Sequence, residues 1–532
     1  MVKAINPIIP GFHPDPSICR VGDDFYLATS TFQWFPGVQL YHSRDLVHWE
    51  ELPSPLRRVS QLDMKGDPNS GGIWGPCLSY CDGTFYLIYT NTKNFHGIFK
   101  DTPNYLVTTT DLYSDWSEPV YLNSSGFDPS MFHDDDGKKY LLNMRWDSRM
   151  ENHDFSGILM QEYSPEEKKL VGEVHCIFKG TEVGATEAPH LYKKDGYYYL
   201  MVAEGGTMYN HGIRMARSKS IFGPYEADPA PLLTVRHNPY SPLQRTGHGS
   251  LVETKNGEWY VPYLCGRPIT SKKRCILGRE TAIAKVVWDR KGWLRLEESG
   301  LTPPTEVNID LEPCEFPPAP ETTTFDMDAL PHSFKTLRIP FDEKIGSLTE
   351  RKGYLRLYGR DSITSWNTQA LVARRLQHHH AEAITKLEFK PDNFQQMAGL
   401  TVMYDTYNFF YLYMSKGDEG DNVLRVFVRD NLKFYNPLMC GISIGDATSV
   451  YLKVNIDELT LKYSYSLDGV NYTDIGGELD CSNLSDEAYG DIGHEGHTGT
   501  FIGMCCHDLS GGEIDPACYA DFEFFTYRPT DN

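Results

Sequence analysis

Five segments within the first three hundred residues repeat one arrangement of polar and apolar positions. Each begins with a polar or aromatic residue, runs through a small residue or proline into an apolar pair, and turns into a strand centred on tyrosine. Four of the turns contain Asp-Gly or Asn-Gly, which is typical of a type I′ hairpin because both central residues need positive φ. The segments begin at Asp15, Trp74, Asp128, Glu187 and His248, and these turns lie at Asp82-Gly83, Asp136-Gly137, Asp195-Gly196 and Asn256-Gly257.

The first residues of the five segments, which we term the motif heads, lie 54 to 61 positions apart. A four-stranded unit repeated at a nearly constant period is typical of a β-propeller. Five repeats therefore predict a five-bladed propeller over residues 1–302. Equivalent positions of the blades converge on the axis of a propeller, so we expect the motif heads to surround one pocket.

The repeat ends near Gly300, and a different pattern follows. Residues 303–320 contain six prolines, a composition that favours a stiff linker, which we place at residues 303–324. Beyond this segment, apolar and polar positions again alternate in strand fashion between polar turns. The pattern predicts a β-sandwich over residues 325–532, and hence an all-β protein of two domains.

The composition narrows the range of partners and compartments. The formal net charge of -22 disfavours binding to nucleic acid or to an anionic membrane surface, whereas a neutral sugar is compatible with it. Neither a membrane-spanning apolar run nor the apolar core of a signal peptide is apparent in the sequence. The 12 cysteines are scattered without a CxxC pair, which favours buried free thiols and a cytoplasmic protein.

Three of the five motif heads are carboxylic acids: Asp15, Asp128 and Glu187. Hydrolysis of an acetal needs one carboxyl group to protonate the leaving oxygen and another to activate water or attack the anomeric carbon. A third carboxylate nearby can raise the pKa of the acid and orient it. An Asp-Pro-Ser turn can also exist for structural reasons alone, but three acids at one repeat position favour catalysis.

The motifs that carry these acids resemble those of glycoside hydrolase family 43, in particular its β-xylosidase branch, and the similarity covers essentially the whole chain. The resemblance implies a propeller with an appended concanavalin-like β-sandwich and an inverting mechanism. It also implies that Asp15 is the general base, Glu187 the general acid and Asp128 the residue that modulates the pKa of the acid. The matching stretches are His13-Pro14-Asp15-Pro16-Ser17, Ile73-Trp74-Gly75-Pro76, Gly126-Phe127-Asp128-Pro129-Ser130, Ala185-Thr186-Glu187-Ala188-Pro189-His190 and Gly278-Arg279-Glu280-Thr281.

Further substrate-binding residues are predicted with help from the resemblance. Trp74 and Trp146 are expected to stack on sugar faces, and Phe32 to form a wall of the pocket. Arg279 resembles an arginine that hydrogen-bonds the substrate and touches the modulating aspartate. Phe501, from the sandwich, is expected to cap the pocket and limit it to about two sugar units.

No metal or other cofactor is predicted to be required. The resemblance suggests that His248 binds an axial water or a divalent cation, but the neighbouring motif heads offer few further ligands. The run at residues 378–380 is a poor zinc site because alternate side chains of a strand face opposite ways. The cluster His494-Glu495-Gly496-His497 is also rejected, since its glycine favours a loop over a helix.

The predicted activity is the release of xylose from the non-reducing end of β-1,4-xylooligosaccharides, with a secondary α-L-arabinofuranosidase activity. A primary α-L-arabinofuranosidase is the nearest alternative, because the same propeller and acids serve both sugars. A non-catalytic carbohydrate-binding propeller is a further alternative, but it has no use for three convergent acids. Similar enzymes lead us to expect a homo-oligomer, either a dimer or a tetramer.

Overall fold

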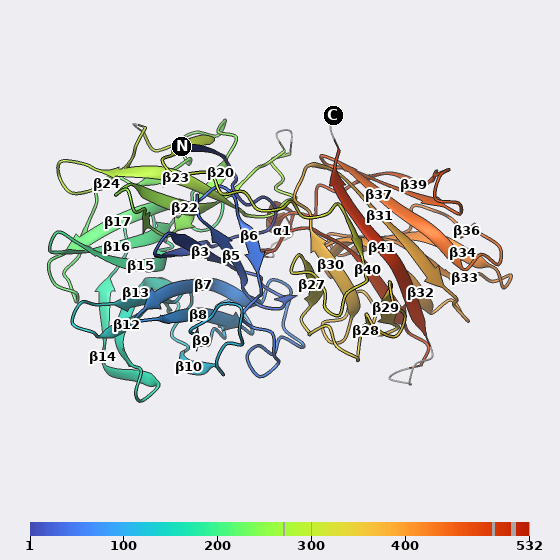
Figure 1. The fold of residues 1–532 in the computed structure, drawn as a ribbon, viewed down its shortest axis with the longest axis horizontal. Coiled ribbons are helices and arrows are strands. Elements are labelled where there is room, and N and C mark those ends of the chain that lie inside the picture. Colours follow the sequence, from blue (N-terminus) through green and yellow to red (C-terminus); the bar gives the residue numbers. More distant parts are fainter. Residues whose placement is uncertain (270–271, 299, 492–494, 512–517, 531–532) are drawn as a thin grey trace.

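The computed structural model describes residues 1–269, 272–298, 300–491, 495–511 and 518–530, and these form two β-domains that lie side by side (Figure 1). The first domain is a five-bladed propeller and the second is a sandwich of two sheets, as the sequence predicts. In the described part of the chain, no helix has the length and apolar character needed to cross a membrane.

The blades of the propeller are antiparallel sheets whose strands are added in chain order. The first strands of neighbouring blades contact one another, so they line the central axis. Within the described residues the blades contain, in turn, β2 (Ser17–Val21), β3 (Asp24–Thr29), β5 (Gln39–Ser43) and β6 (Glu50–Leu52); β7 (Gly72–Cys81), β8 (Thr84–Thr92), β9 (Asn104–Thr109) and β10 (Val120–Asn123); β11 (Ser130–His133), β12 (Lys139–Trp146), β13 (Phe155–Ser164) and β14 (Lys169–Phe178); β15 (Glu187–Lys194), β16 (Tyr197–Glu204), β17 (Gly212–Ser218), β18 (Glu226–Ala227) and β19 (Leu233–Thr234); and β20 (Gln244–Gly249), β21 (Val252–Glu253), β22 (Trp259–Gly266), β23 (Glu280–Trp288) and β24 (Leu294–Leu296).

The predicted hairpins all form, but only two have the predicted turn. Both residues of Asp82-Gly83 and of Asp195-Gly196 have positive φ, as a type I′ turn requires. At Asp136-Gly137 and Asn256-Gly257 only the glycine has positive φ, so the type I′ prediction is wrong there. In the first of these, the Gly137 N–H donates to the Asp134 carbonyl and the Asp134 N–H donates to the Lys138 carbonyl. The loop is therefore longer than a two-residue hairpin turn, and the glycine of the Asp-Gly pair takes the left-handed position near its end.

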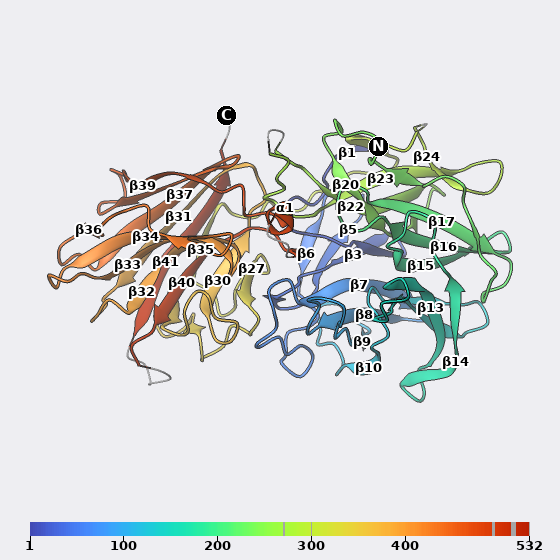
Figure 2. The ribbon, with the colours of Figure 1, turned by 180° about the vertical axis from the view of Figure 1, so that it is seen from behind.

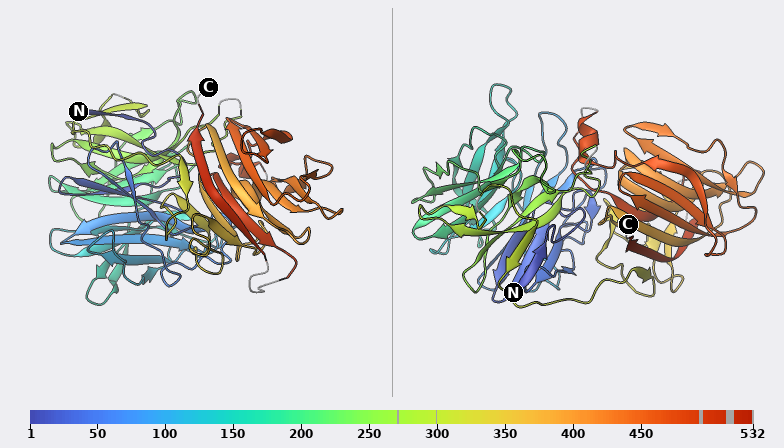
Figure 3. Two further views of the ribbon diagram at one scale, coloured as in Figure 1. Left: turned by 45° about the vertical axis from the view of Figure 1, so that its right-hand side comes forward. Right: turned by 90° about the horizontal axis from the view of Figure 1, so that it is seen from above.

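The segment expected to be a linker contains two strands. β25 (Glu306–Ile309) pairs with β1 (Val2–Ile5), so the first residues of the chain are held on the propeller by residues that follow its fifth blade. β26 (Thr322–Thr324) already pairs with a strand of the sandwich. The residues between these two strands connect the two domains, as the view from above shows (Figure 3).

The sandwich consists of two antiparallel sheets that pack on one core. Among the described residues, one sheet contains β28 (Gly346–Ser347), β29 (Leu355–Tyr358), β41 (Tyr519–Pro529), β31 (His380–Phe389), β37 (Ser449–Asp457), β38 (Thr460–Ser466) and β39 (Thr473–Asp480), with β26 on β41. The other contains β35 (Lys433–Tyr435), β34 (Asn422–Asp430), β33 (Asn408–Lys416), β32 (Gln396–Asp405), β40 (Phe501–Asp508), β30 (Ala370–Arg375) and β27 (Phe334–Leu337), with β36 (Ile442–Ser443) on β34.

The two domains share a sheet as well as a core. The loop that leaves β3 of the first blade contributes β4 (Trp34–Phe35), which pairs with β27 at the edge of the sandwich. Phe12 and Trp34 of the propeller belong to the same buried cluster as Phe501 of the sandwich. A short helix, α1 (Asp486–Gly490), also lies between the domains (Figure 2). The sandwich therefore packs directly on the first blade of the propeller.

All twelve cysteines are free, in agreement with the expectation from the sequence. Most of them are buried, but Cys176 and Cys440 are exposed, so the expectation of burial is wrong for these two.

Candidate active site

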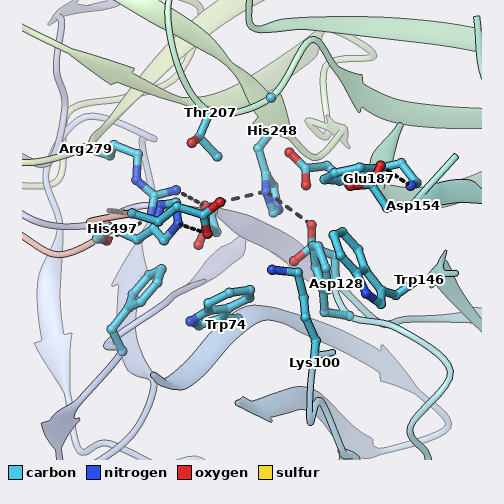
Figure 4. Close-up of a pocket in the computed structure, with 16 residues that line it drawn as sticks. Trp74, Lys100, Asp128, Trp146, Asp154, Glu187, Thr207, His248, Arg279 and His497 are labelled. Carbon is cyan, nitrogen blue, oxygen red and sulfur yellow. Dashed lines mark hydrogen bonds and ion pairs between the residues drawn. The ribbon is translucent and has the colours of Figure 1, made fainter. Parts of the chain in front are cut away.

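A cavity of about 240 Å³ lies where the motif heads converge (Figure 4). The propeller supplies most of its wall, and the sandwich adds two side chains from the loop before β40. The side chains that line the cavity are Asp15, Phe32, Trp74, Lys100, Phe127, Asp128, Trp146, Asp154, Phe155, Glu187, Thr207, His248, Arg279, Glu495 and His497.

The backbone at the start of each blade shows the register of the repeat. Five residues at equivalent places have left-handed φ between 37° and 60°: Asp15, Gly75, Asp128, Ala188 and His248. Such a conformation is costly for any residue other than glycine and is concentrated at functional sites. Glu187 and Trp74 therefore stand one residue before the repeated position, and the prediction that all three acids occupy one repeat position is wrong for Glu187. Its side chain still reaches the shared cavity.

Asp15 is surrounded by groups that favour its charged form. Its Oδ1 accepts a hydrogen bond of 3.1 Å from Arg279 Nη1, and its Oδ2 accepts one of 2.6 Å from the Ser30 hydroxyl. His248 Nδ1 lies 3.5 Å from the same Oδ1. Burial raises the pKa of Asp15, but Arg279, His248 and Ser30 together outweigh it, so the pKa lies below its ordinary value. Asp15 is therefore a carboxylate at neutral pH.

Glu187 and Asp128 have the opposite character. Burial, followed by repulsion from Asp15, raises the pKa of Glu187 to about 8, against opposing effects from Arg279 and Lys100. Burial, followed by repulsion from Glu187 and Asp15, raises the pKa of Asp128 well above its ordinary value. The two buried carboxyl groups disfavour each other's ionisation, so a proton is retained here at neutral pH.

Aromatic rings form one side of the cavity and are fixed by hydrogen bonds to the backbone. The Trp74 Nε1–H donates to the Ser70 carbonyl at 2.7 Å, and the Trp146 Nε1–H donates to the Ile98 carbonyl at 2.8 Å. The Phe32 ring packs 5.9 Å from the Trp74 ring, measured between centroids. Such rigid apolar faces suit the carbon-bound hydrogens of a sugar ring.

Eight of the nine predicted site residues line the cavity, and the exception is Phe501. Its side chain is fully buried in β40 and stacks on Trp34 with 3.7 Å between ring centroids. It also contacts Phe12 edge-on. The expectation that Phe501 caps the pocket is wrong because β40 is a central strand of its sheet, flanked by β30 and β32, and its side chains pack into cores.

The sandwich reaches the cavity through Glu495 and His497 instead. The His497 ring lies 5.8 Å from the Trp74 ring between centroids, and its carbonyl accepts a hydrogen bond of 2.9 Å from Arg279 Nη2. The interaction with His497 lowers the pKa of Glu495 to about 2. These two residues belong to the cluster that the sequence led us to reject as a metal site, and His494 of that cluster lies outside the described residues.

Other lining residues were also missed because they lie in loops, or at the start of an outer strand, that carry none of the repeated motifs. Lys100 lies between β8 and β9, with its Nζ 4.4 Å from the centroid of the Trp146 ring. Asp154 and Phe155 stand at the start of β13, and Thr207 follows β16. The break in strand pattern after each Tyr-centred strand is the only signal that could have indicated them.

The described residues around His248 do not form a set of ligands for the cation that the resemblance suggests. His248 Nδ1 faces Asp15 and also lies 4.0 Å from Asp128 Oδ2. Within the described residues, no group of three or more His, Cys, Asp and Glu side chains is arranged to hold a metal ion.

One buried carboxylate beside two carboxyl groups that retain a proton, in a cavity with an aromatic wall, defines a glycoside hydrolase on a five-bladed propeller. The model of glycosyl hydrolases family 43 matches residues 4–294, and that of the β-xylosidase C-terminal concanavalin A-like domain matches residues 322–528. The chain belongs to glycosyl hydrolases family 43, which acts with inversion at the anomeric carbon.

Relatives match nearly the whole chain. The crystal structure of xylan β-1,4-xylosidase from Bacillus halodurans C-125 has a TM-score of 0.96 and 53% identity, covering 99% of this chain and 100% of that one. A β-xylosidase of Bacillus subtilis (strain 168) is 49% identical over 99% of this chain and 100% of its own length. Xylosidase/arabinosidase 43B of Humicola insolens is 45% identical over 99% and 98% of the two chains.

Proposed function

We propose that this chain is an exo-acting β-xylosidase that releases xylose from the non-reducing end of β-1,4-xylooligosaccharides. The proposal is supported by the family, by relatives that act on xylosides, and by the size of the cavity. At about 240 Å³ the cavity is smaller than the ~300–1,000 Å³ typical of sites for drug-sized ligands, so it suits one sugar ring with part of a second.

Glu187 and Asp15 carry out the proposed displacement. Glu187 gives its proton to the glycosidic oxygen as the bond from that oxygen to the anomeric carbon breaks. Asp15 accepts a proton from a water molecule as the water oxygen bonds to the anomeric carbon on the opposite face. The products are xylose with inverted configuration and a shortened oligosaccharide with a free hydroxyl group. Asp128 is the proposed modulator of the acid: burial and repulsion from Glu187 and Asp15 raise its own pKa well above the ordinary value.

The observation that carries the proposal is the difference in proton affinity between two carboxyl groups of one cavity. The pKa of Asp15 lies below its ordinary value, whereas that of Glu187 is raised to about 8. At neutral pH the pair is therefore poised as a base and an acid without any further proton transfer.

An α-L-arabinofuranosidase activity is proposed as secondary, because a xylopyranoside and an arabinofuranoside present similar hydroxyl groups. The experiment is to incubate the enzyme separately with xylotriose and with an α-L-arabinofuranoside and to follow the products by chromatography. We expect xylose and xylobiose to appear together from xylotriose, with slower release of arabinose. Faster release of arabinose would make the arabinofuranosidase activity the primary one. If the enzyme hydrolyses neither substrate, the proposal is overturned.

We also propose that the reaction needs no metal or cofactor and that the enzyme works in the cytoplasm as a dimer or tetramer. Two carboxyl groups and water are sufficient for the chemistry. We expect full activity after dialysis against EDTA. The intact chain should be recovered from cells rather than from the medium. Light scattering should give a molar mass that is a multiple of 60.6 kDa. A loss of activity that added cation restores would contradict the first part.

A further inference from the structure

A carboxylate of the sandwich domain stands between two buried arginines of the propeller. Asp486 lies on α1, and its Oδ2 is 2.5 Å from Arg245 Nη2 and 3.9 Å from Arg279 Nε. The side chains of Arg245 and Arg279 are 0% and 2% exposed, so water does little to stabilise their charges. The other oxygen, Oδ1, accepts a hydrogen bond of 2.5 Å from the Tyr404 hydroxyl.

The hydrogen bonds of the Arg279 guanidinium come from its two Nη atoms, on the side of the cavity. Its Nη1 donates to Asp15 and its Nη2 donates to the His497 carbonyl, whereas its buried Nε has no hydrogen-bond partner among the residues that the structure describes. That nitrogen faces Asp486. A buried guanidinium needs a counter-charge, so the positive charge of Arg279 is divided between Asp15 in the cavity and Asp486 behind it.

We infer that Asp486 is a positioning residue for the hydrolysis: it holds Arg279 back from Asp15 and partly neutralises its charge. The inference rests on the proposed function, since it concerns the proposed base and acid. It gives the sandwich domain an electrostatic part in catalysis, in addition to its share of the cavity wall.

The sign of the effect follows from the charges around Arg279. Arg279 opposes the rise in the pKa of Glu187 and lowers the pKa of Asp15. Removing the negative charge of Asp486 leaves more of the positive charge unbalanced, so both carboxyl groups must lose their protons at lower pH. The titratable and charged groups that face Asp486 are Arg245 on β20, Cys275 and Arg279 before β23, Tyr404 on β32 and Glu487 on α1.

The experiment compares Asp486→Asn with the wild type by the pH dependence of kcat/KM on xylobiose. Asparagine keeps the size of the side chain but not its charge. We expect the alkaline limb of the profile to move to lower pH by roughly half a unit, with a lower maximum. An unshifted limb would overturn the inference, even if the melting temperature fell.

Glu487→Gln is the matched control. Glu487 Oε1 lies 3.2 Å from Arg245 Nη1, and its Oε2 accepts a hydrogen bond of 3.1 Å from the Cys275 N–H. Among the described residues, Glu487 makes no hydrogen bond or ion pair with Arg279. We expect a lower melting temperature but unmoved limbs, and an equal shift in this variant would overturn the specific role of Asp486.

Tyr404→Phe extends the test if Asp486→Asn does not fold. It keeps the carboxylate but removes a hydrogen bond that partly neutralises it, so more negative charge faces Arg279 and a smaller shift to higher pH is expected. An unmoved limb, or a shift to lower pH, would contradict the inference. Activity of the wild type separates the two hypotheses: an inactive wild type refutes the proposed function, whereas an active wild type with unmoved variants refutes only the role of Asp486.

Discussion

The surroundings of Asp15 and Glu187 shift their proton affinities in opposite directions, although both carboxyl groups face one cavity. Asp15 has a positive neighbour and a hydroxyl donor, whereas the surroundings of Glu187 are dominated by burial and by the negative charge of Asp15. The sequence predicts these residues because the repeat places them at strand starts that converge. It could not predict the magnitude of the shifts, because Arg279 and Lys100 approach from segments outside the five repeated motifs.

The first prediction concerns pH. Activity requires a charged Asp15 and a protonated Glu187, so kcat/KM should fall as pH rises through about 8, where Glu187 loses its proton. The acidic limb should lie below the ordinary pKa of an aspartate, because the folded state lowers that of Asp15. Measured kcat/KM on xylobiose from pH 4 to 10 checks both expectations, because the alkaline limb should fall inside this range and the acidic limb below it. An alkaline limb near pH 5 would contradict the role of Glu187.

The second prediction concerns Gly75, whose φ of 43° favours glycine. A Cβ at this position would lie 2.3 Å from Asp128 Oδ1. Gly75→Ala should therefore displace the Asp128 carboxyl group and lower kcat by about 100-fold, since a small misplacement of a catalytic group costs that much. The readouts are kcat on xylobiose and the melting temperature.

Gly83→Ala is its control, in the turn between the first two strands of the same blade. Gly83 also has positive φ, but an added Cβ would meet no atom of the described residues within 4 Å. Backbone strain alone should cost about 1 kcal/mol of stability and leave kcat unchanged. Equal losses of kcat in the two variants would show that the contact with Asp128 is unimportant.

At the scale of elements, the loop before β40 lines the cavity, whereas β40 itself, which was expected to do so, packs in the core. The sequence motif around Phe501 correctly indicates that the sandwich approaches the cavity. It places the contact on the wrong residue, because a central strand directs its large side chains into cores, whereas loops reach across an interface. The same reason explains why β4, β25 and β26 were missed: their partners lie elsewhere in the chain.

The third prediction separates these two elements. Phe501→Leu should lower the free energy of unfolding by about 1–3 kcal/mol, through lost packing against Trp34 and Phe12. Its KM for xylobiose should stay within twofold of the wild-type value. His497→Ala keeps the carbonyl that binds Arg279 but removes a ring from the cavity, so its KM should rise several-fold. A wider cavity in Phe501→Leu, seen as a changed preference between xylobiose and xylotriose, would contradict this assignment.

At the scale of the whole molecule, the sandwich completes the catalytic propeller. It pairs with β4, shares a core that contains Phe12 and Phe501, and supplies the carbonyl that holds Arg279. The repeat and the change in composition after Gly300 predict the two domains and their order. They could not reveal that the domains depend on each other, because each contact joins segments hundreds of residues apart.

The fourth prediction follows from this dependence. A fragment of residues 1–321 should be aggregated, or soluble with less than about one-thousandth of the wild-type kcat/KM, because β4 loses its partner and Arg279 loses its bond to His497. Adding residues 322–532 as a separate chain should restore activity in part. A soluble fragment with wild-type kcat/KM would show that the sandwich is dispensable.

The proposed mechanism is tested most directly by the configuration of the first product. A proton NMR time course of xylobiose hydrolysis, with Glu187→Gln run alongside, follows each anomer before mutarotation mixes them. An inverting mechanism predicts that α-xylose appears first with the wild-type enzyme, and that Glu187→Gln is slower by about a hundredfold or more. Early β-xylose, or a Glu187→Gln enzyme as fast as the wild type, would contradict it.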